Sequence, residues 1–305
     1  FAALAMVGTM QHAQAVDGPG RREGWPSGVA ENGYAKYIGT AFDPTKGLVV
    51  GPNMGNNNTT RANGNVATVA IGAHSNATGS SSVAIGGAVV NGAGAIGLGW
   101  STANGDNSVA LGGTGSTIAN GNNTFAASGG SATGNGAIAI GWQTNAKNDA
   151  TAVGSNAQAT DKDSAFAASG GNASGESAIA IGSSAIAGGR GGVAVGWSAE
   201  SAVNAVGIGF NAKAKANNTV AIGVEANNDN TISNNYSSVS VGVATRARAV
   251  GSMAMGVSAD ASGKYSIALG SGDVSGDYTA NVNYPKATGE KAIAIGYNSN
   301  SSNER

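Results

Sequence analysis

Side chains that commonly perform catalysis are scarce in this chain. It contains two histidines and no cysteine, so thiol chemistry is excluded. His12 and His74 are isolated, and no group of His, Asp and Glu has the spacing of metal ligands. Serine is plentiful, but no G-x-S-x-G turn accompanies a histidine and an acid that would activate it. We therefore expect no catalytic residue, no metal site and no cofactor, and we expect that the protein is not an enzyme.

Two groups of side chains have the chemistry to contact a ligand instead. Three of the four tryptophans directly follow the glycine of a recurring short sequence, and tryptophan is enriched where binding energy concentrates, although these three could instead cover an edge of the fold or a seam between chains. Four cations alternate with alanine in two short stretches, which favours either a solvated face or a weak patch for acidic ligands. The candidate ligand contacts are Trp100, Trp142, Trp197, Lys213, Lys215, Arg246 and Arg248.

These residues lie in or just after a short sequence that recurs along the chain. The stretch 107–113 reads NSVALGG, and sixteen variants of it follow one another at intervals of mostly 13 or 14 residues. Insertions lengthen two of the intervals, at 224–241 and at 271–295. Such regular self-similarity predicts a repeat protein in which each unit packs only on its neighbours.

Each repeat predicts two short strands. In the first, large residues flank a small one, as in VAI at 69–71, and this alternation has the period of a strand. In the second, alanine alternates with polar residues, as in KAK at 213–215. Asn, Gly and Asp cluster between the strands, where tight turns need residues that tolerate a positive φ. We expect successive coils to stack in parallel about 4.8 Å apart, as a β-solenoid with alanine inside.

With alanine inside, the Val and Ile side chains of the first strand must point outward and form an apolar stripe. Soluble monomers rarely expose an apolar patch of this size. We therefore expect the stripe to be buried against copies of the same chain. The candidate interface residues are Val109, Leu111, Ile138, Ile140, Ile179, Ile181, Val220 and Ile222.

The repeated S-V-A-[IL]-G, preceded by asparagine as at 107–112, resembles the head repeat of YadA-like trimeric autotransporter adhesins. The resemblance covers roughly residues 65–300, and its specificity comes from the number of copies. It implies an all-β, left-handed parallel β-roll (β-solenoid) of about 16 coils with 13–14-residue repeats, assembled as a homotrimer. It also implies display at the cell surface from the Gram-negative outer membrane. Members of this family reach the membrane through a neck, a stalk and a C-terminal anchor, and we expect membrane contact only through such an anchor, which this chain does not contain.

Four segments are predicted along the chain. An apolar run followed by A-x-A at 13–15 is typical of the end of a secretory signal peptide. The irregular region after it contains two glycine-ended stretches, 37–39 and 49–51, which predict degenerate coils that cap the open end of the stack. The predicted segments are 1–15, the end of a signal peptide; 16–64, an irregular N-terminal cap; 65–300, the head repeats; and 301–305, the start of a connection to a neck and stalk. Two insertions, around 227–237 and 273–290, are expected to protrude as loops.

Two function classes follow from this interpretation. The first is a non-enzymatic adhesin head that binds a host matrix protein, a host cell-surface receptor or its own kind on neighbouring cells. The second is a structural spacer or surface-layer element whose specificity lies elsewhere. The chain has 16 basic and 17 acidic residues, so no basic excess favours nucleic acid as a partner.

Overall fold

The computed structural model describes most of the repeat region. The described residues are 38–43, 47–54, 58–62, 67–113, 116–160, 164–226, 237–272 and 283–302. The predicted signal-peptide segment 1–15 lies outside them, as do 227–236 and 273–282 within the predicted loops. In this part of the chain every regular element is a strand, and no helix is long and apolar enough to cross a bilayer.

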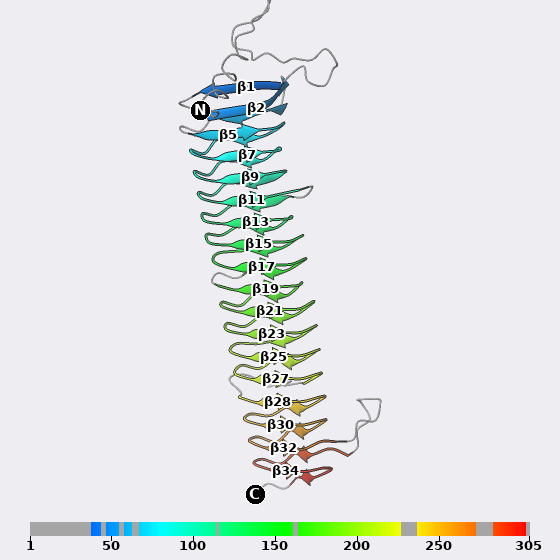
Figure 1. The fold of residues 1–305 in the computed structure, drawn as a ribbon. Coiled ribbons are helices and arrows are strands. Elements are labelled where there is room, and N and C mark those ends of the chain that lie inside the picture. The colour runs from blue at the N-terminus through cyan, green and yellow to red at the C-terminus, as the bar shows by residue number, and fades with distance from the viewer. Residues whose placement is uncertain are drawn as a thin grey trace, which may run out of the picture. The chain divides into compact units, whose positions relative to one another are not determined.

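The chain is an all-β parallel β-solenoid of about 15 turns with repeats of about 14 residues, which confirms the predicted stacking of parallel coils. It divides into two compact units, residues 1–132 and residues 133–305. In each unit a coil consists of a first strand, a turn that starts at the repeat glycine, a second strand and a second turn. Within each unit, first strands pair in parallel with first strands of neighbouring coils, and second strands pair with second strands (Figure 1).

In unit 1 the first strands are β5 (Thr68–Ile71), β7 (Val83–Ile85), β9 (Ile96–Leu98), β11 (Val109–Leu111) and β13 (Phe125–Ala127). Its second strands are β4 (Arg61–Ala62), β6 (Asn76–Ala77), β8 (Val89–Val90), β10 (Ser101–Ala103), β12 (Thr117–Ala119) and β14 (Ser131–Ala132). Three further strands, β1 (Ile38–Asp43), β2 (Gly47–Met54) and β3 (Asn58–Thr59), precede them in the chain.

In unit 2 the first strands are β15 (Ile138–Ile140), β17 (Thr151–Val153), β19 (Phe166–Ala168), β21 (Ile179–Ile181), β23 (Val193–Val195), β25 (Val206–Ile208), β27 (Val220–Ile222), β28 (Val239–Val241), β30 (Met253–Met255), β32 (Ile267–Leu269) and β34 (Ile293–Ile295). Its second strands are β16 (Asn145–Ala146), β18 (Gln158–Ala159), β20 (Asn172–Ala173), β22 (Ile186–Ala187), β24 (Glu200–Ser201), β26 (Lys213–Ala214), β29 (Arg246–Ala247), β31 (Asp260–Ala261), β33 (Lys286–Ala287) and β35 (Asn300–Ser301).

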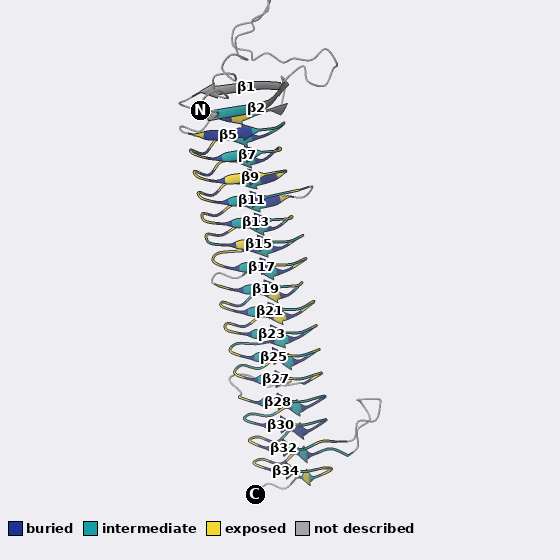
Figure 2. Cartoon of the chain, viewed as in Figure 1, coloured by how far each residue is buried: buried dark blue, intermediate teal, exposed yellow. Residues whose placement is uncertain are grey.

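Alanine fills the interior of each unit, as predicted. In unit 2, Ala254 and Ala268 of the first strands form one fully buried cluster with Ala247 and Ala261 of the second strands. A side chain this small allows the two strands of a coil to approach closely, so no larger residue is needed to fill the space between them. Figure 2 shows the resulting alternation, in which the central residue of a first strand is buried and its flanking residues are not.

Some of the buried hydroxyl groups at the ends of the turns bond within their own turn. The hydroxyl of Thr144 donates to the carbonyl of Gly141 at 2.9 Å. The hydroxyl of Ser82 donates to the carbonyl of Gly79 at 2.6 Å. Each acceptor lies three residues before its donor, so the bond closes the turn within one coil. A buried hydroxyl without a partner would cost stability, and this short bond avoids that cost.

Two consecutive coils in unit 1 depart from the alanine rule, and the two departures compensate each other. Val90 stands where the neighbouring second strands place Ala77 and Ala103. Gly97 stands in the first-strand position that is alanine in both neighbouring coils. An added Cβ at Gly97 would lie 2.6 Å from Cγ2 of Val90, so the glycine makes room for the larger valine.

This pairing gives a direct test of interior packing. Gly97→Ala is expected to lower the free energy of unfolding by about 1–3 kcal/mol, because the new methyl group overfills the coil. Adding Val90→Ala to the same chain should recover most of that loss, since the coil then matches its neighbours. Chemical denaturation of the two variants measures both effects. A double variant no more stable than Gly97→Ala alone would show that the two positions do not share one space.

The repeat glycines carry the backbone around the first turn. Gly209 has φ +127°, a conformation that is essentially restricted to glycine. A Cβ at Gly209 would also overlap the backbone carbonyl of Gly223 in the next coil. Both the dihedral angle and the close stacking of turns therefore require glycine at this place.

Asparagine side chains link the second turns in unit 1. The side-chain amide of Asn91 donates to Oδ1 of Asn104 at 2.7 Å, and that of Asn104 donates to Oδ1 of Asn120 at 2.9 Å. The hydroxyl of Thr78 extends the row by donating to Oδ1 of Asn91 at 2.7 Å. Each of these bonds joins two coils, so the row adds side-chain hydrogen bonds to the backbone ladder along the stack axis.

Strands β1 and β2, which come earliest in the chain, lie at one end of unit 1. Strand β2 pairs in parallel with β5 and aligns Val50 with Ile71, so the stretch 49–51 continues the coil register as predicted. Strand β1, however, pairs antiparallel with β2. The prediction that 37–39 is a degenerate coil was therefore wrong for its described residues, Ile38 and Gly39. The chain reverses into a hairpin there, which places a further strand on the edge of β2.

Two boundaries in unit 2 differ from the prediction. Strand β33 (Lys286–Ala287) pairs with β31 as an ordinary second strand, so the loop expected to reach 290 ends before Lys286. Strand β35 extends the coils to Ser301, inside the predicted connecting segment 301–305. In both cases the second strand is short and has no large Val or Ile to mark it.

Candidate functional site

The outward residues of the first strands form an apolar surface in each unit, which we call the first-strand face. Unit 1 places Val109 and Leu111 on it, and both are half-buried. Unit 2 places the other six predicted interface residues on it, and Ile138 and Ile222 are exposed at 36% and 37%. The remaining four, Ile140, Ile179, Ile181 and Val220, are half-buried. All eight lie on the expected face, and their role in an interface stays a prediction.

Aromatic side chains lie at the first turn. Trp100 in unit 1 and Trp142 and Trp197 in unit 2 are all more than half exposed. Trp197 contacts Phe210 of the next coil, with ring centroids 4.7 Å apart, whereas Trp100 lies 5.3 Å from His74. His74 is therefore half-buried against an indole ring. These exposed rings could contact a ligand, and that role stays a prediction.

The second strands of unit 2 carry the predicted cations, on what we call the second-strand face. Lys213 and Arg246 are half-buried, and Lys215 and Arg248 are exposed. The ammonium group of Lys215 lies 3.5 Å from the carboxylate of Glu200 in the neighbouring coil. Part of the predicted positive charge is thus neutralised within the protein.

Asp260 also has an outward backbone position on the second-strand face. The alternation of alanine with polar residues in the second strands predicts that its side chain points into solvent. Instead it is only 5% exposed, and one carboxylate oxygen lies 3.9 Å from the guanidinium group of Arg248. Its strand lies between those of Arg246 and Lys286, directly in register with both. Two long cationic side chains flank a short acidic one, which explains why the carboxylate is covered although the backbone faces outward.

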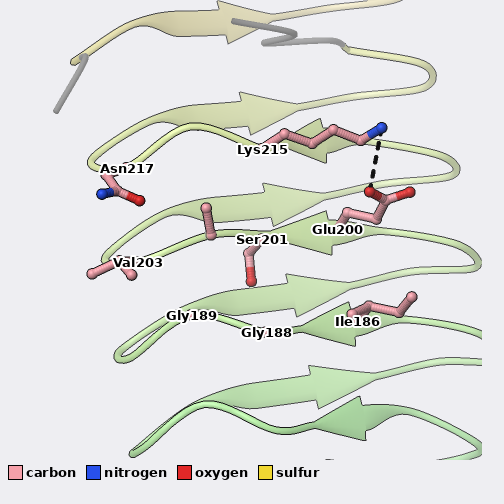
Figure 3. A pocket seen from close by; sticks show the side chains of 9 residues that line it. Ile186, Gly188, Gly189, Glu200, Ser201, Val203, Lys215 and Asn217 are labelled. Carbon is pink, nitrogen blue, oxygen red and sulfur yellow. Dashed lines mark ion pairs between the residues drawn. The ribbon is translucent and has the colours of Figure 1, made fainter. Parts of the chain in front are cut away.

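A shallow groove of about 340 Å³ lies across three coils of unit 2 (Figure 3). Gly188 and Gly189 have no side chains and leave it open, while Ile186 and the Glu200–Lys215 pair stand along it. The sequence did not predict this groove, although the two adjacent glycines between larger residues are a signal for it. An open groove with a few apolar side chains and one ion pair fits a weak surface contact and lacks an enclosed site for chemistry.

The described residues also show which side chains could together hold a metal ion. Among them, no three His, Asp or Glu side chains lie close enough together to hold a metal ion. Ser201, beside the groove, takes the place that alanine takes in the neighbouring second strands. Its hydroxyl is buried and lies 2.8 Å from where a Cβ of Gly192 would stand.

Comparison with known proteins supplies one match. The model of a family described as "YadA head domain repeat (2 copies)" matches this chain in eight segments. The segments are 65–88, 91–114, 132–149, 146–165, 173–199, 201–226, 247–272 and 287–305. A comparison with curated proteins found no match. The family model thus covers both units, from the coil that contains β5 to the end of the chain.

Proposed function

The chain belongs to the family of YadA head domain repeats, and on this premise we propose that it is the head of a trimeric surface adhesin. In the proposed state three chains form left-handed β-rolls that pack their first-strand faces together. Further segments display this head from the outer membrane of a Gram-negative bacterium. There it attaches to host matrix proteins, to host cells, or to heads on neighbouring bacteria.

The first-strand face is the observation that supports this proposal. Most coils of unit 2 leave two large apolar side chains half-buried or exposed in the single chain, as at Ile293 and Ile295, which are 58% and 67% exposed. Full burial of a side chain of this size contributes roughly 1.5–3 kcal/mol. A face repeated in coil after coil favours association of identical chains in register, since each coil then meets the same coil of its partner.

We also propose that adhesion needs neither catalysis nor a bound cofactor. The interior holds alanine, the described groove is shallow, and the side chains that the chain presents outward are mostly apolar, amide or single charged groups. Recognition is then spread over several coils and repeated on three equivalent faces. Weak single contacts suffice in this arrangement, because threefold presentation raises avidity without new contacts.

A deletion in register tests whether adhesion is distributed. Removal of residues 151–178 takes out two coils without tryptophan and joins Ala150 to Ile179, which keeps the strand order. We expect the shortened head to stay folded and to adhere less strongly, but still measurably, to a surface coated with matrix protein. A solid-phase binding assay with the complete head as reference measures the loss.

Two outcomes of the same assay would contradict distributed adhesion. If Trp100→Ala, Trp142→Ala or Trp197→Ala alone abolishes binding while the fold is preserved, the energy is concentrated at the aromatic turns. If no matrix protein or cell binds the complete head, the chain acts as a structural spacer.

A further inference from the structure

Asparagine followed by glycine recurs in the second turns of unit 1. The Asn-Gly pairs are 91–92, 104–105 and 120–121, and side-chain hydrogen bonds join their asparagines into what we call the asparagine row. The close stacking of these turns requires glycine, because an added Cβ at Gly92 would overlap the backbone carbonyl of Gly105. Gly105 stands in the same relation to Gly121. The fold therefore requires glycine directly after Asn91 and Asn104.

An asparagine before glycine is open to attack by its own backbone. The amide nitrogen of the glycine attacks Cγ of the asparagine, a new C–N bond closes a five-membered succinimide ring, and the Cγ–Nδ2 bond breaks. The proton of the attacking N–H passes through water to the departing nitrogen, which leaves as ammonia. Water then opens the ring and gives aspartate or isoaspartate. Glycine favours the attack because no Cβ shields its nitrogen.

The hydrogen bonds of the row oppose this reaction, because the asparagine side chain has to leave them to turn toward its own backbone. Asn91 accepts from the hydroxyl of Thr78 at 2.7 Å and donates to Asn104 at 2.7 Å. Asn104 donates in turn to Asn120 at 2.9 Å. Among the described residues, no group accepts a hydrogen bond from the side-chain amide of Asn120. Two bonds thus hold Asn91 and Asn104, whereas one bond holds Asn120.

The attacking backbone nitrogens differ in the same direction. The amide of Gly92 donates to the carbonyl of Ala103 at 3.4 Å. The amide of Gly121 donates to no group in the part of the chain that the structure describes. Asn120 is also exposed, so water reaches the ring that would form there. Of the three pairs, the one at Asn120 has the fewest hydrogen bonds to break.

We propose that Asn120 is a deamidation site of the folded protein and that the asparagine row protects Asn91 and Asn104. The aspartate that forms at position 120 still accepts the bond from Asn104, and a charged acceptor strengthens such a bond. The reaction therefore adds a negative charge to a second turn of unit 1 without removing a bond of the row. It is independent of adhesion and requires only that this turn is exposed to water.

Timed incubation of the full chain at mildly alkaline pH tests the proposal, with mass spectrometry of its peptides to measure aspartate and isoaspartate at each site. Asn104 is the matched reference for Asn120, because alanine precedes and glycine follows both of them. In the folded protein Asn120 should react roughly fivefold faster than Asn104, which is the effect of one additional hydrogen bond. In denaturant, where the row is absent, the two rates should become nearly equal. The proposal is overturned if Asn120 reacts no faster than Asn104 in the folded protein, or if the same ratio persists in denaturant.

A variant of the row tests the protection directly. Asn104→Ala removes the acceptor for the side-chain amide of Asn91, so deamidation of Asn91 should become roughly fivefold faster. The control Thr102→Ala changes an outward side chain of β10 in the same coil and leaves the row intact, so Asn91 should react as in the parent. Thermal melting establishes that both variants are folded. An unchanged rate at Asn91 in Asn104→Ala, or an equal increase in both variants, would show that the row gives no protection.

Discussion

Replacement of Ile138 and Ile140 with aspartate is expected to break the proposed trimer into monomeric or unfolded chains. Both residues lie on the first-strand face of β15. Three chains would lose six buried isoleucines, roughly 9–18 kcal/mol at 1.5–3 kcal/mol for each. The six new carboxylates would also have to be buried between apolar surfaces of the three chains. Their loss of hydration raises the free energy of the trimer further. Sedimentation velocity and circular dichroism measure the loss of mass and of strand structure.

The control places the same charges on the opposite strand. Gln158 and Asn172 are outward residues of β18 and β20 on the second-strand face. The variant Gln158→Asp/Asn172→Asp should keep both the mass and the circular dichroism of the parent. If the isoleucine variant also keeps its mass, the first-strand face is not the surface at which chains meet.

Gly209→Ala is expected to destabilise the head by at least about 2 kcal/mol. The φ of +127° is strained for any residue with a Cβ, at a cost of order 1–3 kcal/mol. The new methyl group would also overlap the carbonyl of Gly223, so the neighbouring turn has to move. Thermal and chemical denaturation of the head measure the effect.

Gly188→Ala serves as the matched control in the same unit. Its φ is not in the left-handed region, and an added Cβ would meet only Oγ of Ser174, at 4.0 Å. We expect a change in stability close to zero. If Gly209→Ala is as mild as Gly188→Ala, the first turns do not depend on glycine in the way that the stacked geometry requires.

The local pattern was sufficient to predict the coil. In a stretch such as 138–140 the small residue between two large ones can only be the interior position, because two short turns leave no space for isoleucine between the strands. The parallel stacking and the outward direction of Val and Ile follow from that single constraint. The same reasoning placed all eight predicted interface residues on the first-strand face.

Features that depend on contacts between coils were not predictable from one repeat at a time. Asp260 has an outward backbone position and is nevertheless buried, because Arg246 and Lys286 flank it in register. In the sequence of its own repeat, Gly97 looks like a poor match to the usual alanine. The structure shows that the side chain of Val90 occupies the space that an alanine Cβ would take. To predict either contact, one must know which residues of neighbouring coils are in register. A constant repeat length gives that register only where no insertion lies between the coils.

The antiparallel hairpin of β1 and β2 shows a different limit. The stretches 37–39 and 49–51 look alike in sequence, since each ends a short apolar run with glycine. One continues the parallel register and the other reverses direction. Strand direction depends on the length and path of the connection, and a three-residue motif carries no information about either.

The mass of the native head in solution at micromolar concentration tests the central claim most directly. Sedimentation equilibrium should give about 88 kDa, three times the 29.3 kDa of the single chain. Association should persist on dilution as long as the strand signal in circular dichroism persists, because folding and assembly bury the same first-strand face. A folded species of 29.3 kDa, stable with its first-strand face in water, would contradict the account.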